Sequence, residues 1–145
     1  MAEARIIIGV GAVIEDDIGR ILLVKHKPER GGFWQGKWIC PGGELELGEL
    51  IEKGIEREVK EETQLRIDLV RPLLPFDRVV WSKGSVVLHV IYLDYLAQVT
   101  GGTLKPGSDI GEAMWVEKKR IPEMWGEIHE DAQKLLQIAG VITMR

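Results

Sequence analysis

Apolar residues follow two kinds of pattern along the chain, and together the patterns predict a mixed α/β domain. Apolar positions at helical spacing predict helices over about residues 49–63 and 128–139. Runs rich in Val, Ile and Leu that are bounded by Gly, Pro or Asp predict β-strands. These runs are residues 5–14, 21–25, 37–40, 66–80, 85–99 and 113–116. The pattern favours one domain over residues 1–145, with a mixed β-sheet sandwiched between α-helices.

Composition narrows the class of partner. The chain has 145 residues, of which 45% are hydrophobic, and its formal net charge is −4. A net negative charge argues against a non-specific grip on polymeric nucleic acid, which requires clustered Lys and Arg. It leaves phosphate-bearing small molecules open, because Mg²⁺ can bridge carboxylates and phosphates.

Location and assembly follow from weaker signals. No apolar run reaches the length of a membrane helix, and no secretory signal follows Met1. Cys40 is the single cysteine, so an intrachain disulfide is excluded. We therefore expect a cytoplasmic protein without membrane contact. The apolar run at residues 86–96 suits either a core or an interface, which leaves a homodimer open.

Three glutamates share one face of the first predicted helix. Glu58, Glu61 and Glu62 stand at positions i, i+3 and i+4, which places their carboxylates side by side. Like charges at this spacing destabilise a helix, and a hard divalent cation with oxygen ligands would relieve the repulsion. The alternative is a solvated helix face balanced by neighbouring lysines.

The residues around this face form an ordered frame. Glu49 and Arg57 are eight residues apart, about two helical turns, and could form an ion pair that holds the face rigid. The sequence Pro41-Gly42-Gly43 predicts a tight turn before the helix, where backbone carbonyls can also reach a metal.

The segment at residues 43–65 resembles the Nudix box. That motif is a Gly, five residues, a Glu, seven residues, Arg-Glu, an apolar residue, any residue, Glu-Glu, any residue, a Gly and an apolar residue. The matching positions are Gly43, Glu49, Arg57, Glu58, Val59, Glu61, Glu62 and Leu65. Gln64 stands where the motif has its late Gly, which predicts a strained backbone or a shifted helix end at that position.

The resemblance implies a Nudix hydrolase. Such enzymes cleave a diphosphate linked to a nucleoside or similar group, using water and two or three Mg²⁺ or Mn²⁺ ions. Carried over to this chain, Glu58, Glu61 and Glu62 would coordinate metal, and Glu58 also matches the position often assigned as general base. Gly43 or its neighbour would add a carbonyl ligand, and Arg57 with Glu49 would orient the face.

Many members add a metal ligand from a later loop. The candidates here are Asp109 and Glu112, and their spacing to Trp115 favours Asp109. Ordinary loop polarity is the alternative for both.

The candidate substrate residues flank the box. Trp34 and Lys37 precede it, and Trp125 and Glu127 stand near the last helix, where an aromatic face could stack on a base. The segment at residues 121–127 resembles the base-binding region of oxidised-purine triphosphate pyrophosphatases. Either Trp could instead anchor the core or its loop, and Trp34 could alternatively form a dimer contact.

The resulting prediction is a MutT-like pyrophosphohydrolase acting on nucleoside di- or triphosphates, such as oxidised or excess nucleotides. The alternatives are hydrolysis of ADP-ribose, of dinucleoside polyphosphates or of a non-nucleotide diphosphate. Submotifs typical of the first two are absent at the expected spacing after the box. A catalytically silent nucleotide-binding module is a further alternative.

Overall fold

The computed structural model describes residues 4–143, and this part of the chain contains seven strands, two α-helices and three short 3₁₀ helices. The elements are β1 (Arg5–Glu15), β2 (Ile21–His26), η1 (Pro28–Arg30), β3 (Gly42–Glu44), α1 (Ile51–Thr63), β4 (Arg66–Pro72), β5 (Phe76–Ser82), β6 (Ser85–Gly101), β7 (Ile110–Val116), η2 (Lys118–Arg120), η3 (Pro122–Glu127) and α2 (Glu130–Ile138).

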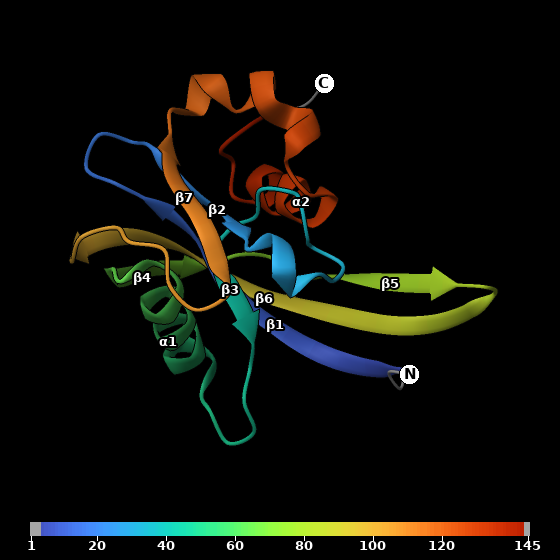
Figure 1. The fold of residues 1–145 in the computed structure, drawn as a ribbon. Helices are drawn as coiled ribbons and strands as arrows, with labels where there is room; N and C mark the ends of the chain where they lie inside the picture. Colours follow the sequence, from blue (N-terminus) through green and yellow to red (C-terminus); the bar gives the residue numbers. More distant parts are fainter. Residues whose placement is uncertain (1–3, 144–145) are drawn as a thin grey trace.

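The strands form one mixed sheet. Its order is β4-β6-β1-β2-β7, with β3 paired to β1 and β5 paired to β6. The β1 and β6 strands run parallel over their whole contact, whereas the other pairs are antiparallel. Helices α1 and α2 lie on opposite sides of this sheet (Figure 1). The predicted architecture, a mixed sheet between helices, is confirmed.

Alternation along β1 divides the core into two halves. Val10 and Ile14 point to one side and pack with Ile55 of α1. Val13 points to the other side and packs with Leu136 of α2. Because successive side chains of a strand point to opposite faces, one apolar strand buries itself against both helices. Both helices therefore pack against this central strand.

The β1 and β2 strands separate soon after their hairpin, and residues 39–44 fill the space between them. Ile39 exchanges backbone hydrogen bonds with Val24 of β2, at 2.9 and 2.8 Å. Gly42 then pairs with Gly11 of β1. A Cβ on Gly42 would overlap the carbonyl oxygen of Val10, so only glycine allows this close approach. The insertion brings β3 beside α1.

Two local predictions differ from the structure. The strand predicted at residues 37–40 is reduced to isolated bridges at Trp38 and Ile39, and the strand forms instead at β3, where a tight turn was predicted. The strand predicted at residues 66–80 is two strands, β4 and β5, which pair with different parts of β6. The break falls before Pro75, which lacks the N–H that a continuous ladder needs.

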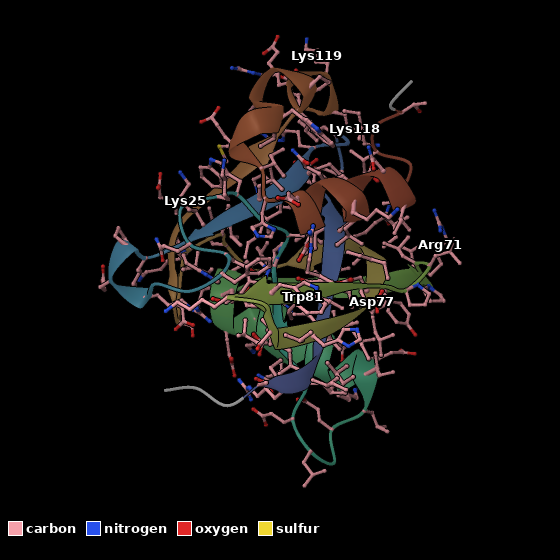
Figure 2. All side chains as sticks on the ribbon, turned by 90° about the vertical axis from the view of Figure 1, so that its right-hand side faces the viewer. Lys25, Arg71, Asp77, Trp81, Lys118 and Lys119 are labelled. Atoms are coloured by element: carbon pink, nitrogen blue, oxygen red, sulfur yellow. The ribbon has the colours of Figure 1, made fainter. Side chains whose placement is uncertain are left out.

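The β5–β6 hairpin extends beyond the body of the sheet (Figure 1). Trp81 is 65% exposed on this hairpin, and Figure 2 shows it on the side turned to the viewer. The start of the apolar run at residues 86–96 is exposed here, while Val90 and Asp94 are buried. A homodimer through this surface stays a prediction. No helix within residues 4–143 combines the length and apolarity that crossing a bilayer requires.

The close approach at Gly42 yields a stability prediction. We expect Gly42→Ala to lower the free energy of unfolding by about 1–3 kcal/mol, because the added methyl group displaces the backbone of β1. Urea denaturation would measure the change. Gly126→Ala is the matched control, since a Cβ there meets open space. An unchanged midpoint for Gly42→Ala would contradict the packing at β3.

Candidate functional site

Arg57 is the centre of the hydrogen-bond network on α1. Its Nε and Nη2 atoms donate to the two carboxylate oxygens of Glu49, at 2.6 and 2.9 Å. This confirms the expected ion pair, and the bond from Arg57 holds the pKa of Glu49 at about 2. Its Nη1 donates to Glu58 at 2.8 Å, and Nη2 donates to the carbonyl of Glu44 at 3.3 Å. One guanidinium thus joins the helix to the segment that precedes it.

The three glutamates of the face differ in burial. The side chains of Glu58 and Glu61 are 13% and 49% exposed, and Glu62 is 5% exposed as a whole residue. Burial raises the pKa of Glu58, and the nearby guanidinium opposes this effect. Burial also raises the pKa of Glu62, although the N–H of Gly42 donates to its carboxylate at 2.8 Å. Desolvated carboxylates on one face favour a bound cation.

The donor set fits a hard divalent cation. Glu58 and its neighbours on the face offer carboxylate oxygens, which Mg²⁺ and Mn²⁺ prefer. Gly43 lies so close that a Cβ there would overlap the carboxyl group of Glu58. Within residues 4–143, however, no three acidic, His or Cys side chains converge in a ready-made metal group. Glu58 and Glu61 are drawn to Arg57, so a cation has to compete with that guanidinium.

Gln64 stands at the end of α1, in a backbone conformation that favours glycine. The helix ends at Thr63, and Gln64 adopts a left-handed conformation with φ 66° and ψ 13°. Its N–H donates to the carbonyl of Lys60 at 2.9 Å, which caps the helix. The expected strained backbone is confirmed, because a residue with a side chain adopts this region less readily than glycine.

A cavity of about 310 Å³ lies over the acidic face. Its lining includes Glu58, Glu61, Glu62 and Gly43, together with Asp109. All five residues predicted as metal ligands therefore line the same cavity.

The two candidates for a later metal ligand lie in different places. Asp109 faces the cavity and accepts a hydrogen bond from Nε of Arg30 at 2.8 Å. Glu112 lies outside the lining and approaches Nζ of Lys25 at 4.0 Å. The position therefore favours Asp109.

His26 is a lining residue that the sequence did not identify. It ends β2, is buried, and has an Nδ1 atom without a hydrogen-bond partner in the described part of the chain. Burial lowers its pKa, and so does the nearby Arg30. A register shift in the β2–β7 ladder falls between Lys25 and His26.

Aromatic side chains line another part of the cavity. Nε1 of Trp34 donates to the hydroxyl of Tyr92 at 3.1 Å, and Tyr92 donates to Asp131. Asp131 also accepts from Nε of Arg78 at 2.9 Å. The ring of Phe76 stacks on Tyr92 at 4.7 Å with an interplanar angle of 21°. Hydrogen bonds therefore fix this aromatic wall in place.

One of the four predicted substrate residues lines the cavity, and the other three lie next to one another outside its lining. Trp34 lines the cavity. Lys37 points elsewhere and donates to the carbonyl of Gly126 at 2.7 Å. Trp125 belongs to η3 and is half-buried against the core around α2, and Glu127 is exposed. Neither of the last two lines the cavity.

Asp94 is a second lining residue that the sequence did not identify. It is 7% exposed, on the same face of β6 as Val90 and Tyr92. Its burial raises its pKa to about 7. These three positions alternate within the apolar run at residues 86–96, and this alternation can be seen in the sequence. The acidic residue inside such a run was the signal that could have identified Asp94.

A family comparison agrees with this geometry. A family model described as the NUDIX domain matches residues 5–136, which is most of the chain. The chain therefore belongs to the Nudix hydrolase family.

Individual relatives carry different names. The chain is similar to an ADP-ribose pyrophosphatase of Methanocaldococcus jannaschii, at 36% identity over 81% of the chain and 65% of that protein, so it spans less than two thirds of that relative. It is also similar to the nucleoside triphosphatase NudI of Escherichia coli, at 26% identity over 90% of the chain and 94% of that protein. A solved NUDIX hydrolase structure from Nitrosomonas europaea superposes with a TM-score of 0.76 and 25% identity, over 94% of the chain and 89% of its own.

Burial of Asp94 predicts a pH-dependent stability. Because the folded-state pKa of about 7 lies above the unfolded value, the folded chain holds the proton longer, and stability falls as the pH rises through this interval. We expect the stability advantage of Asp94→Asn over the wild type to grow between pH 5 and pH 8 by on the order of a few kcal/mol. Thermal unfolding at both pH values measures this, and equal differences at the two pH values would refute it.

Proposed function

We propose that this chain hydrolyses a diphosphate linkage in a nucleotide-type substrate and depends on Mg²⁺ or Mn²⁺. The observation that carries the proposal is the partly buried carboxylate face of α1, held by Arg57 and opening into a cavity with an aromatic wall. The first part suits a diphosphate with its cations, and the second suits a flat ring.

The charges of the cavity explain why cations are required. Seven carboxylates line it, against two guanidiniums, those of Arg5 and Arg30. A polyphosphate entering alone would meet net repulsion. When bound, divalent cations would neutralise the phosphates and lower the pKa of an attacking water. Glu58, Glu61 and Glu62 would hold them, with the carbonyl of Gly43 and the carboxylate of Asp109.

The remaining roles belong to the protein itself. Glu58 faces the cavity and is the candidate base that accepts the proton of the attacking water. Arg57 donates to Glu58 while it binds Glu49 through both oxygens, so it is a positioning residue for the face. Arg30 donates to Asp109, and with Asp109 as a metal ligand its guanidinium would be free to bind a substrate phosphate.

A nucleoside triphosphate is the first candidate substrate. The chain is similar over nearly its full length to a protein named as a nucleoside triphosphatase. ADP-ribose is the second candidate, because the archaeal relative at 36% identity is named as its pyrophosphatase. Dinucleoside polyphosphates, non-nucleotide diphosphates and a silent binding module remain as outcomes of the same assay.

A substrate panel tests the proposed reaction. We expect release of pyrophosphate or monophosphate in the presence of Mg²⁺, loss on chelation, and a decrease in kcat of at least about 100-fold in Glu58→Gln, because the variant lacks the base and one anionic ligand. The panel contains normal and oxidised nucleoside triphosphates, ADP-ribose, dinucleoside polyphosphates and sugar nucleotides.

The control for this variant is Glu56→Gln on the same helix, which pairs with Lys53 outside the cavity and should keep wild-type turnover. Full activity of Glu58→Gln on the best substrate would remove Glu58 from the reaction. Tight nucleotide binding without any turnover would favour the silent module.

Asp109 and Glu112 can be separated by a matched pair of variants. We expect Asp109→Asn to raise the Mg²⁺ concentration for half-maximal activity by about tenfold, because one anionic oxygen ligand is lost near the metal face. Glu112→Gln should leave it unchanged, since Glu112 lies outside the cavity. Metal titrations of the steady-state rate decide the matter, and the reverse order would assign the ligand to Glu112.

A further inference from the structure

Asp94 is a buried carboxylate that the proposed reaction does not use. It faces the cavity from β6, opposite Gly11 of β1, where a Cβ would lie only 3.0 Å from its Oδ1. Within residues 4–143 no side-chain or backbone group hydrogen-bonds to its carboxylate oxygens. Because an unpaired buried carboxylate is costly, its presence needs a reason beyond folding.

The neighbouring polar groups of the aromatic wall are already paired. The hydroxyl of Tyr92 donates to Asp131 and accepts from Nε1 of Trp34. The second oxygen of Asp131 accepts from Arg78. Of the two carboxylates beside this wall, Asp94 is the one without a hydrogen-bond partner among the described residues. In its ionised form this group only accepts.

We propose that Asp94 selects the base of the substrate. Its carboxylate binds a 2-amino-6-oxopurine by accepting hydrogen bonds from the two adjacent N–H donors on the edge of that base. The proposal rests on the proposed function, because it deepens the recognition of a nucleotide at the same cavity. The two oxygens of one carboxylate match two neighbouring donors, while the rings of Trp34, Phe76 and Tyr92 form the apolar surroundings that a flat base requires.

Other groups fit this position less well. Adenine and cytosine present one donor beside a ring-nitrogen acceptor, whose lone pair would face the carboxylate. Uracil and thymine place their single donor between two carbonyl oxygens. A phosphate would bring negative charge against Asp94 without an intervening cation. In each case a buried polar group stays unpaired or repelled, which costs more than the loss of one hydrogen bond in water.

Binding without metal tests the subsite separately from catalysis. Titration calorimetry with chelator present would compare GMP with AMP at about pH 8.5, above the pKa of about 7 of Asp94, so that its carboxylate is ionised. We expect the wild type to bind GMP at least about tenfold more tightly than AMP. Asp94→Asn should lose this preference, because the amide replaces one acceptor with a donor.

The control is Asp68→Asn on β4, which is exposed and lies outside the cavity. It should keep the wild-type ratio of GMP to AMP affinity. The thermal unfolding of Asp94→Asn shows whether that variant is folded. An unchanged ratio in folded Asp94→Asn would overturn the proposal, and so would a wild type that prefers AMP or binds both monophosphates equally.

Turnover distinguishes this proposal from the proposed function. If the wild type prefers GMP through Asp94 but hydrolyses nothing in the panel, the reaction is refuted and the subsite stands. If it hydrolyses nucleotides with Mg²⁺ while Asp94→Asn keeps the same base preference, the subsite is refuted and the reaction stands. Glu58→Gln should retain GMP binding while it loses turnover, since Glu58 belongs to the metal face.

Discussion

The bonds of Arg57 are the constraint on which the site depends. Three carboxylates on adjacent positions of α1 repel one another, and two of them are largely removed from water. Arg57 compensates part of this charge at Glu58 and fixes its own position through both oxygens of Glu49. Its bond to the carbonyl of Glu44 extends the restraint to the end of β3. The face is therefore rigid before any cation arrives, which lowers the entropy cost of binding one.

The separation of β1 from β2 connects this face to the rest of the cavity. The inserted segment places the N–H of Gly42 against Glu62, and Gly42 itself pairs with Gly11 on β1. Gly11 in turn lies opposite Asp94 on β6. Two glycines thus let the backbones of β1 and β3 approach closely, and the approach sets the distance between the metal face and the aromatic wall.

Much of the fold and of the acidic face could be predicted from sequence, because both depend on residues that are near one another in the chain. Helical spacing was enough to place Glu58 beside Glu62. The pair of Glu49 and Arg57 was expected along one helix, whereas in the structure Glu49 lies before the start of α1. The aromatic wall could not be predicted in this way, since Trp34, Tyr92 and Asp131 come from three separate elements and meet through the register of the sheet. Short local patterns also cannot distinguish an aromatic residue that faces a cavity from one that packs in the core. For that reason Trp125 and Glu127 were placed at the substrate, whereas in the structure neither lines the cavity.

The two parts of the cavity separate the reaction from the choice of substrate. In the proposed reaction the acidic face would meet a diphosphate and its cations, a feature that triphosphates and ADP-ribose share. The aromatic wall would then distinguish one substrate from another. Most of its polar groups already have partners: Arg78 and Tyr92 both donate hydrogen bonds to Asp131, so Asp131 supports the wall. A substitution at Asp94 would then change which base the cavity prefers without disturbing the acidic face. The reason is that no hydrogen bond joins Asp94 to the network of Arg57 within the described residues. Similar proteins that bear the names of different substrates are what such a separation predicts.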